Sequence, residues 1–247
     1  MSLLFAYSGV EAPLHQCLAD LAAVSPGTAG SWGLGCYDGA DAQLTRDPAA
    51  RGHVAGFVDQ SGGVSALLLS HKGEARDPPA ALANCQPFAR ELMGCVHLFA
   101  MQGDLQGLED SRAYPTGVYT PIGDTAAERA FCVLMSRMRA LWQDDKPLPE
   151  VRLAVVSDFA ARMRPLGLAN FIYADSELLF VHGHQQLDEP TRPGLFLAQG
   201  EGAVRVSGRA LDSAGWEGLE PGEVVAIKGG EVLDRCAPIK LWSQLRD

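Results

Sequence analysis

The sequence predicts an α+β fold in which two sheets stack face to face and the helices lie outside them. Short apolar segments typical of strands fill the first hundred residues, and short strands return after residue 169. Two long helical segments occupy the stretch between them, over residues 125–166. Helices segregated between two blocks of strands are typical of α+β proteins with stacked sheets.

Four apolar runs in the first block predict strands, because each is short and is bounded by turn residues. They cover residues 3–7, 32–38, 64–70 and 96–101. The stretch 74–90 between the last two is rich in Pro and Ala and is predicted to be a loop.

Two helices are predicted within the same block. The first covers residues 12–23, because Leu14, Leu18 and Leu21 recur at helical spacing. The second begins at Asp47-Pro48 and runs to about residue 59. Asp is a good helix cap, and Pro fits the first helical position because its missing N–H is not needed there.

The central segment predicts two longer helices. Thr125-Ala126-Ala127-Glu128 fits a capping box. The helix that follows extends to about residue 144, and a second helix covers 149–166. The side chains expected on the buried side of the first are Phe131, Leu134, Met138 and Leu141.

The last block predicts short strands joined by turns. Asp175-Ser176 and Gly229-Gly230 are typical hairpin turns. The predicted strands cover residues 170–174, 178–182, 195–198, 204–207, 224–228 and 231–233.

Length and composition limit the classes of protein to consider. A chain of 247 residues suits one compact domain, predicted to span 1–247. The formal net charge of -10 argues against nucleic-acid and anionic-membrane partners. No apolar run reaches the ~20 residues that span a bilayer, and the apolar start lacks the basic flank of a signal peptide. The six cysteines form no C-x-x-C pair, so we expect reduced thiols in a cytoplasmic protein and no zinc site.

Histidines and glycines give no independent sign of a metal or a nucleotide. His182-Gly183-His184 lacks an acidic or thiol partner nearby and is interpreted as a surface hairpin. His71 and His97 are expected to be strand histidines with satisfied hydrogen bonds. The chain has no Walker loop and no G-x-G-x-x-G fingerprint, so no cofactor is predicted.

Six stretches match motifs of one protein family in the same order along the chain. Each matches a motif of one family, such as Ala-His-Asn-Gly-x-Leu, which stands here as Ala100-Met101-Gln102-Gly103-Asp104-Leu105. The matched stretches are residues 1–9, 30–35, 84–88, 100–105, 125–131 and 216–223. Together they resemble the small stand-alone class II glutamine amidotransferases. The resemblance implies an N-terminal-nucleophile fold, a four-layer αββα sandwich of two antiparallel sheets with helices outside.

The resemblance places Ser2 at the nucleophile position. In the family this residue is a cysteine, which becomes the first residue when methionine is removed and uses its own α-amine as general base. Serine can act in this way, but cysteine is intrinsically the better nucleophile. The other interpretation is that Ser2 simply precedes a buried strand.

Gln102 and Gly103 match the family's oxyanion hole, which uses an asparagine side chain and the N–H of the following glycine. Glutamine carries the same amide one methylene further out, and displaced donors lose the oxyanion geometry. Gly103 could equally be an ordinary turn residue after a strand.

The groups that would hold free glutamine are replaced. The family's arginine for the α-carboxylate lies in a stretch that matches Ser70-His71-Lys72-Gly73, and its place is taken by Gly73. Lys72 is adjacent, but neighbouring side chains on a strand point to opposite faces. Ala126 stands where the family has the aspartate for the α-amine.

These replacements give one leading hypothesis and two alternatives. The leading hypothesis is a binding or regulatory pseudoenzyme that lacks normal glutaminase activity and takes a small-molecule ligand or a protein partner. In the first alternative, Ser2 is the nucleophile of an N-terminal-serine amidohydrolase that acts on a γ-glutamyl or other amide substrate. In the second, the chain supports an active homologue as a subunit. The sequence is also compatible with a homodimer.

Overall fold

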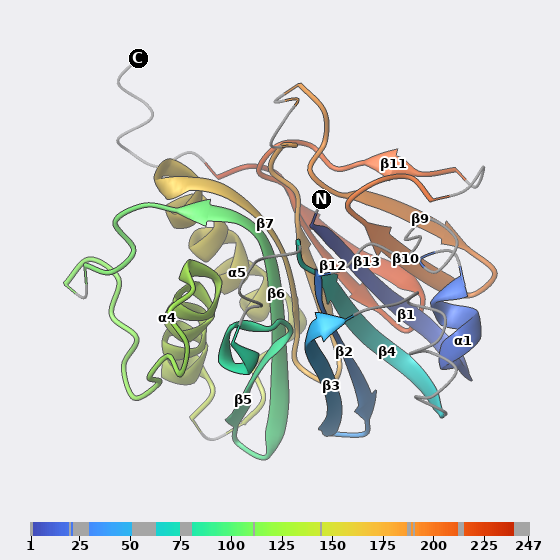
Figure 1. Ribbon diagram of the computed structural model, residues 1–247, viewed down its shortest axis with the longest axis horizontal. Helices are drawn as coiled ribbons and strands as arrows, with labels where there is room; N and C mark the ends of the chain where they lie inside the picture. Colours follow the sequence, from blue (N-terminus) through green and yellow to red (C-terminus); the bar gives the residue numbers. More distant parts are fainter. Residues whose placement is uncertain are drawn as a thin grey trace.

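A computed structural model describes residues 2–19, 21, 30–50, 63–74, 81–110, 112–143, 145–186, 189, 191–211 and 215–239 (Figure 1). Its strands form two antiparallel sheets, one of seven strands and one of six. The predicted α+β class with two stacked sheets is confirmed.

The seven-stranded sheet has the order β11-β9-β10-β1-β4-β2-β3, so β1 is its central strand. Its strands are β1 (Leu3–Pro13), β2 (Gly30–Asp38), β3 (Asp41–Ala50), β4 (Val64–Lys72), β9 (Phe196–Gly200), β10 (Ala203–Ser207) and β11 (Glu217–Gly218).

The six-stranded sheet has the order β13-β12-β8-β7-β6-β5. Its strands are β5 (Phe88–Leu92), β6 (Cys95–Leu105), β7 (Gly167–Ala174), β8 (Leu179–His182), β12 (Val224–Lys228) and β13 (Glu231–Cys236). The helices are α1 (Leu14–Cys17), α4 (Ala126–Leu141) and α5 (Pro149–Met163), with short 3-10 turns at Leu82–Asn84 and Arg164–Leu166.

The layers follow from the alternation of side chains along each strand. On β1, Leu4 and Ala6 enter the core between the sheets, whereas Leu3, Phe5 and Tyr7 enter a second core on the outer face. Helices α4 and α5 cover the outer face of the six-stranded sheet (Figure 1). Among the described residues, α1 with Leu18 and Leu21 covers the outer face of the other sheet.

Helix α4 begins at the predicted cap. The Thr125 hydroxyl accepts a hydrogen bond from the Glu128 N–H at 3.2 Å. Glu128 does not complete the capping box, because its carboxylate accepts from the N–H groups of Ile122 and Gly123 and from Arg90. The helix ends at Leu141, which is 47% exposed and so lies outside the buried side predicted for it.

Two predicted helices of the first block are corrected. Strand β1 continues to Pro13, so the helix starts at Leu14 and not at residue 12, although the three leucines that predicted it share one core. The helix predicted from Asp47 is wrong where it is described, because β3 continues to Ala50. Pro48 is tolerated there since β3 is an edge strand. Residues 51–59 lie outside the described residues.

Two further predictions are corrected in part. The loop predicted over 74–90 contains a 3-10 turn at Leu82–Asn84 and the start of β5. His182 belongs to no surface hairpin, because it is fully buried on β8 and its Nδ1 lies 3.0 Å from the Glu223 carbonyl oxygen. Among the described residues no cluster of three His, Cys, Asp or Glu side chains could hold a metal ion.

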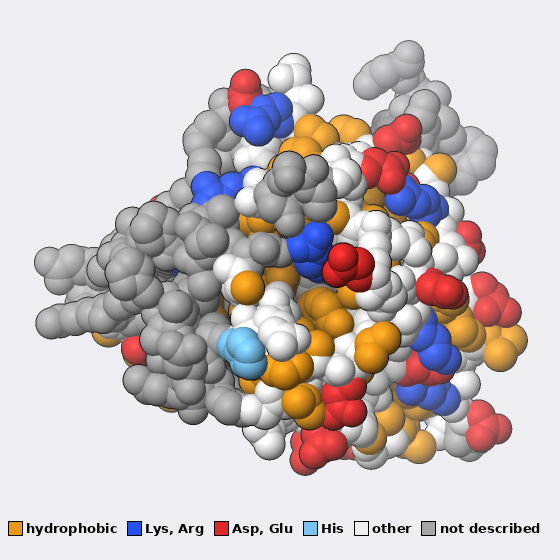
Figure 2. Space-filling model, turned by 90° about the vertical axis from the view of Figure 1, so that its right-hand side faces the viewer, with side chains coloured by type: hydrophobic (Ala, Val, Ile, Leu, Met, Phe, Trp, Pro, Cys, Tyr) orange, Lys and Arg blue, Asp and Glu red, His pale blue; other side chains and the backbone are white. Residues whose placement is uncertain are grey.

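The surface beside α1 mixes side chains of every type. Hydrophobic side chains lie exposed over the middle of this face, with acidic and basic side chains around them (Figure 2). Within the described residues, no helix has the length and apolar character needed to cross a membrane.

Candidate functional site

Ser2 stands at the start of the central strand of its sheet. It shares the strand face of Leu4 and Ala6, so its side chain is directed toward the six-stranded sheet. Ser2 is half-buried. The start of β1 therefore carries a hydroxyl group into the space between the two sheets.

His71 is the nearest described partner of the Ser2 hydroxyl. Its Nε2 lies 3.0 Å from Ser2 Oγ. His71 belongs to β4 and pairs in register with Leu4, so it shares the inter-sheet face. Burial lowers the pKa of His71 to about 4, and the ring is therefore neutral at pH 7.

The hydrogen-bond network indicates which nitrogen of His71 carries the proton. Nδ1 is buried and has no hydrogen-bond partner among the described residues. A proton on Nδ1 would leave a buried N–H unpaired, which is rarer in proteins than an unpaired acceptor. The tautomer with the proton on Nε2 is therefore favoured, and in it His71 donates to Ser2 Oγ.

Gln102 connects the two sheets at this point. It lies on β6, and its Nε2 donates to the Ser2 carbonyl oxygen at 3.1 Å. The longer glutamine side chain lies beside Gly208, where an added Cβ would come within 3.7 Å of Gln102 Oε1. One N–H of the amide is thus engaged by the backbone of Ser2.

The backbone at position 103 leaves no room for a side chain larger than that of glycine. Its φ is +139°, and a Cβ placed there would lie 1.8 Å from the Leu168 carbonyl oxygen. It pairs in register with Ala169, whose N–H donates to His184 Nδ1 at 3.4 Å. Gly103 is exposed.

Gly73 follows His71 and Lys72 at the end of β4. Its N–H donates to the Ser31 carbonyl oxygen at 2.8 Å. A Cβ at Gly73 would lie 2.2 Å from Ser31 Oγ, so a larger residue requires that side chain to move. Lys72 pairs with Leu3 and belongs to the opposite face from His71. Burial, with Arg209 nearby, lowers the pKa of Lys72.

Ala126 is not brought to Ser2 by any contact among the described residues. It lies in the first turn of α4 and packs against the core beneath that helix. Asp124, two residues before Ala126, accepts a hydrogen bond from Asn84 Nδ2 at 2.6 Å, which ties the start of α4 to the 3-10 turn before β5.

Gln86 holds the strand that carries Gln102, a role that the sequence analysis did not assign to it. Its side-chain amide pairs with the backbone of Met101, accepting from the N–H at 2.6 Å and donating to the carbonyl oxygen at 2.9 Å. Its own carbonyl oxygen would lie 2.1 Å from a Cβ at Gly33. Gln86 therefore extends β6 pairing beyond β5, and no local sequence pattern marks such a side-chain pairing.

The site's residues thus gather from distant parts of the chain. Ser2, His71 and Gln102 lie together at the start of β1, and Gly103 follows Gln102 on β6, against β7. Lys72 faces the outer side, and Ala126 lies on α4.

Comparison with known proteins identifies the family to which the chain belongs. Residues 14–199 match the family model described as glutamine amidotransferases class-II. YafJ of Escherichia coli (strain K12), named as a candidate glutamine amidotransferase, is 26% identical over 167 residues, 67% of this chain and 64% of its own. A candidate glutamine amidotransferase of Haemophilus influenzae is 24% identical over 184 residues, covering 73% of this chain and 58% of its own. The chain spans about three fifths of the length of these curated relatives.

Solved structures share the fold. A predicted glutamine amidotransferase from Pseudomonas aeruginosa PA01 has a TM-score of 0.65 at 23% identity, covering 95% of this chain and 100% of that one. The glutamine phosphoribosylpyrophosphate amidotransferase of B. subtilis has a TM-score of 0.67 at 14% identity, covering 94% of this chain and 48% of that one. With the family match over most of its length, the chain belongs to the class II glutamine amidotransferase family.

Proposed function

We propose that this chain uses the site around Ser2 to bind a small molecule or a protein partner and does not hydrolyse glutamine at a normal rate. The observation that carries the proposal is the set of groups around the Ser2 hydroxyl. His71 is neutral, Gln102 is a neutral amide, and Gly73 has no side chain. Among the described residues, no charged side chain contacts the Ser2 hydroxyl to hold the two charged ends of free glutamine.

The same surroundings leave Ser2 weakly activated. A general base works best when its pKa lies near the operating pH, whereas burial lowers the pKa of His71 to about 4. The favoured tautomer donates to Ser2 Oγ and leaves no lone pair on Nε2 to accept its proton. In Ser-His-Asp triads an acidic group on Nδ1 selects the opposite tautomer, and none contacts His71 among the described residues.

The oxyanion site is altered in a way that supports the proposal. Gln102 donates to the carbonyl oxygen of Ser2 itself, which is not the position of a substrate oxygen. Loss of one oxyanion donor typically costs ~10²–10³ in rate. Combined with a serine nucleophile, this predicts glutamine turnover close to the uncatalysed background.

A glutaminase assay tests the proposal. Purified protein is incubated with glutamine, and glutamate formation is measured for the wild type, Ser2→Ala and the matched control Ser8→Ala, which changes another serine of β1. We expect the same background rate in all three. Turnover that Ser2→Ala abolishes and Ser8→Ala retains would overturn the proposal.

One contact supports a second candidate function. The 3.0 Å distance between Ser2 Oγ and His71 Nε2 fits a nucleophile in contact with a base. With Gly73 in place of a charged residue, such an enzyme would act on an amide that lacks the two charged ends of free glutamine. It requires removal of Met1, which the intact mass reports. A retained Met1 eliminates the α-amine base, and absence of covalent labelling of Ser2 by a fluorophosphonate probe eliminates activation by His71.

A further inference from the structure

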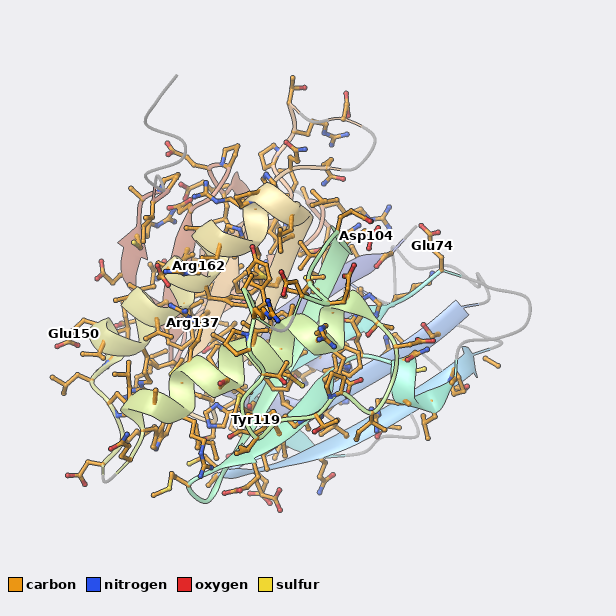
Figure 3. All side chains as sticks on the ribbon, turned by 90° about the vertical axis from the view of Figure 1, so that its left-hand side faces the viewer. Glu74, Asp104, Tyr119, Arg137, Glu150 and Arg162 are labelled. Atoms are coloured by element: carbon orange, nitrogen blue, oxygen red, sulfur yellow. The ribbon has the colours of Figure 1, made fainter. Side chains whose placement is uncertain are left out.

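A cavity of about 500 Å³ lies on the helix side of the six-stranded sheet, separate from the site at Ser2. Its lining includes Leu92, Met93, Val118, Ser136, Arg139 and Trp142. These residues come from the β5–β6 hairpin, the loop before α4 and the second half of α4. Figure 3 views this side of the molecule, with α4 in front and Tyr119 below it.

The walls of the cavity are fixed by specific contacts. The Tyr119 hydroxyl donates to the Glu91 carbonyl oxygen at 3.3 Å, which ties the loop to the hairpin. Gly117 has a φ of +62°, and a Cβ there would lie 2.5 Å from Ser136 Oγ, so the loop packs closely on α4. The cavity is therefore a product of three packed elements.

The floor is aromatic and held in place. Trp142 is only 3% exposed, and its ring meets the His97 ring edge-on at a centroid distance of 5.0 Å. The cations of Lys146 and Arg152 lie 5.6 and 5.8 Å from its centroid. Such contacts fix the ring orientation.

The rim exposes large apolar side chains. Met93 is 53% exposed and Val118 is 69% exposed. Met93 also has a φ of +51°, a conformation that costs a residue other than Gly, Asn or Asp of order 1 kcal/mol or more. The turn thus tolerates a backbone cost while presenting an apolar side chain at the cavity mouth.

Arg139 supplies the one charged group of the lining. The other two arginines of α4 are engaged: Arg129 donates to two backbone carbonyls, and Arg137 pairs with Asp158. Within the part of the chain that the structure describes, no carboxylate forms an ion pair with Arg139, although the chain carries a net charge of -10. Burial raises the pKa of the Tyr119 phenol, and Arg139, which lies beside the Tyr119 hydroxyl, opposes this rise.

We propose that this cavity binds a small amphipathic carboxylate, with its apolar part against Met93 and Val118 and its carboxylate on Arg139. The cavity volume lies in the range of small-molecule sites, about 300–1,000 Å³. A guanidinium matches a carboxylate with two parallel hydrogen bonds. One cation fits one negative charge, which argues against a nucleotide with several phosphates.

The test compares an acid with its neutral analogue. Binding of 4-phenylbutyrate and 4-phenylbutanamide is measured by titration of amide NMR shifts in the full chain. We expect saturable binding of the acid that perturbs Gly117 and the Arg139 backbone. Arg139→Gln is expected to weaken binding of the acid about twofold to fivefold, as loss of one exposed ion pair predicts, and to leave binding of the amide unchanged. Arg192→Gln, which changes an exposed arginine far from the lining, is the matched control.

Three results would overturn the proposal. The first is absence of saturable binding by the acid. The second is equal binding of acid and amide with no effect of Arg139→Gln. The third is a dimer in sedimentation that Val118→Asp dissociates, because a second copy of the chain would then cover the cavity.

Discussion

Three histidines buried as neutral rings predict that the protein loses stability steeply in mild acid. Burial lowers the pKa of His71 and His97 to about 4 and that of His182 to about 3. In the unfolded chain each ring takes up a proton near pH ~6.5. Between these values the unfolded state binds more protons, so stability is present above about pH 6.5 and falls as the pH is lowered toward 4.

The magnitude follows from the size of these differences. Each unit of pKa difference corresponds to ~1.4 kcal/mol. Between pH 7 and pH 5 each ring therefore costs about 2 kcal/mol, and the three together cost on the order of 5 kcal/mol. Domains of this kind are stable by about 5–15 kcal/mol in total, so a large share is lost before the carboxylates begin to titrate.

Urea unfolding at pH 7, 6 and 5 measures this loss directly. Single replacements measure the contribution of each histidine to this pH dependence while keeping a hydrogen-bonding nitrogen in place. His97→Asn and His182→Asn put an amide at the position of Nδ1, and His71→Gln puts one at the position of Nε2. Each variant is expected to reduce the change between pH 7 and 5 by about one third. A pH dependence that all three variants leave unaltered would refute the reasoning.

Three further predictions concern buried charges and one glycine. Arg152→Ala leaves the fully buried Asp175 without its 2.8 Å partner and is expected to cost about 3–5 kcal/mol in urea unfolding, most of which the added change Asp175→Asn restores. Glu128→Ala removes the acceptor of two N–H groups and of Arg90, so a loss of about 3 kcal/mol is expected by calorimetry, with Glu128→Gln intermediate. Gly103→Ala places a Cβ 1.8 Å from a carbonyl oxygen and should lower the melting temperature by several degrees, whereas alanine at the open turn of Gly107 should do so less.

Much of the fold could be predicted from local patterns. The strand at the start of the chain, the cap at Thr125 and the turn at Gly229-Gly230 were each marked by residues whose chemistry acts over a few positions. A sheet must bury its apolar face against another layer of structure. Two blocks of strands therefore predicted two sheets stacked face to face.

Other features depend on partners distant in the sequence. Asp47-Pro48 has the chemistry of a helix start, but pairing with β2 along its length makes the segment an edge strand. Ala42 and Leu44 do alternate with polar residues and pack against the inter-sheet core, a period-2 signal that was available. His182 is buried because β8 lies inside the sheet between β7 and β12 and its ring packs on Phe171, and nothing near it in the sequence indicates this pairing.

The candidate site shows how a family resemblance can rest on residues that carry no chemistry. Gly33 and Gly103 are retained where a Cβ would lie 2.1 and 1.8 Å from a backbone oxygen, so almost no replacement is tolerated whatever the protein does. A Cβ at Gly73 would meet side-chain atoms of Ser31 and His71 and no backbone atom, and Ala126 lies on a partly buried helical turn, so backbone packing restricts both positions less. The motifs that identify the family are thus set largely by backbone packing. They predict the sandwich well, whereas activity depends on positions that packing leaves free to vary.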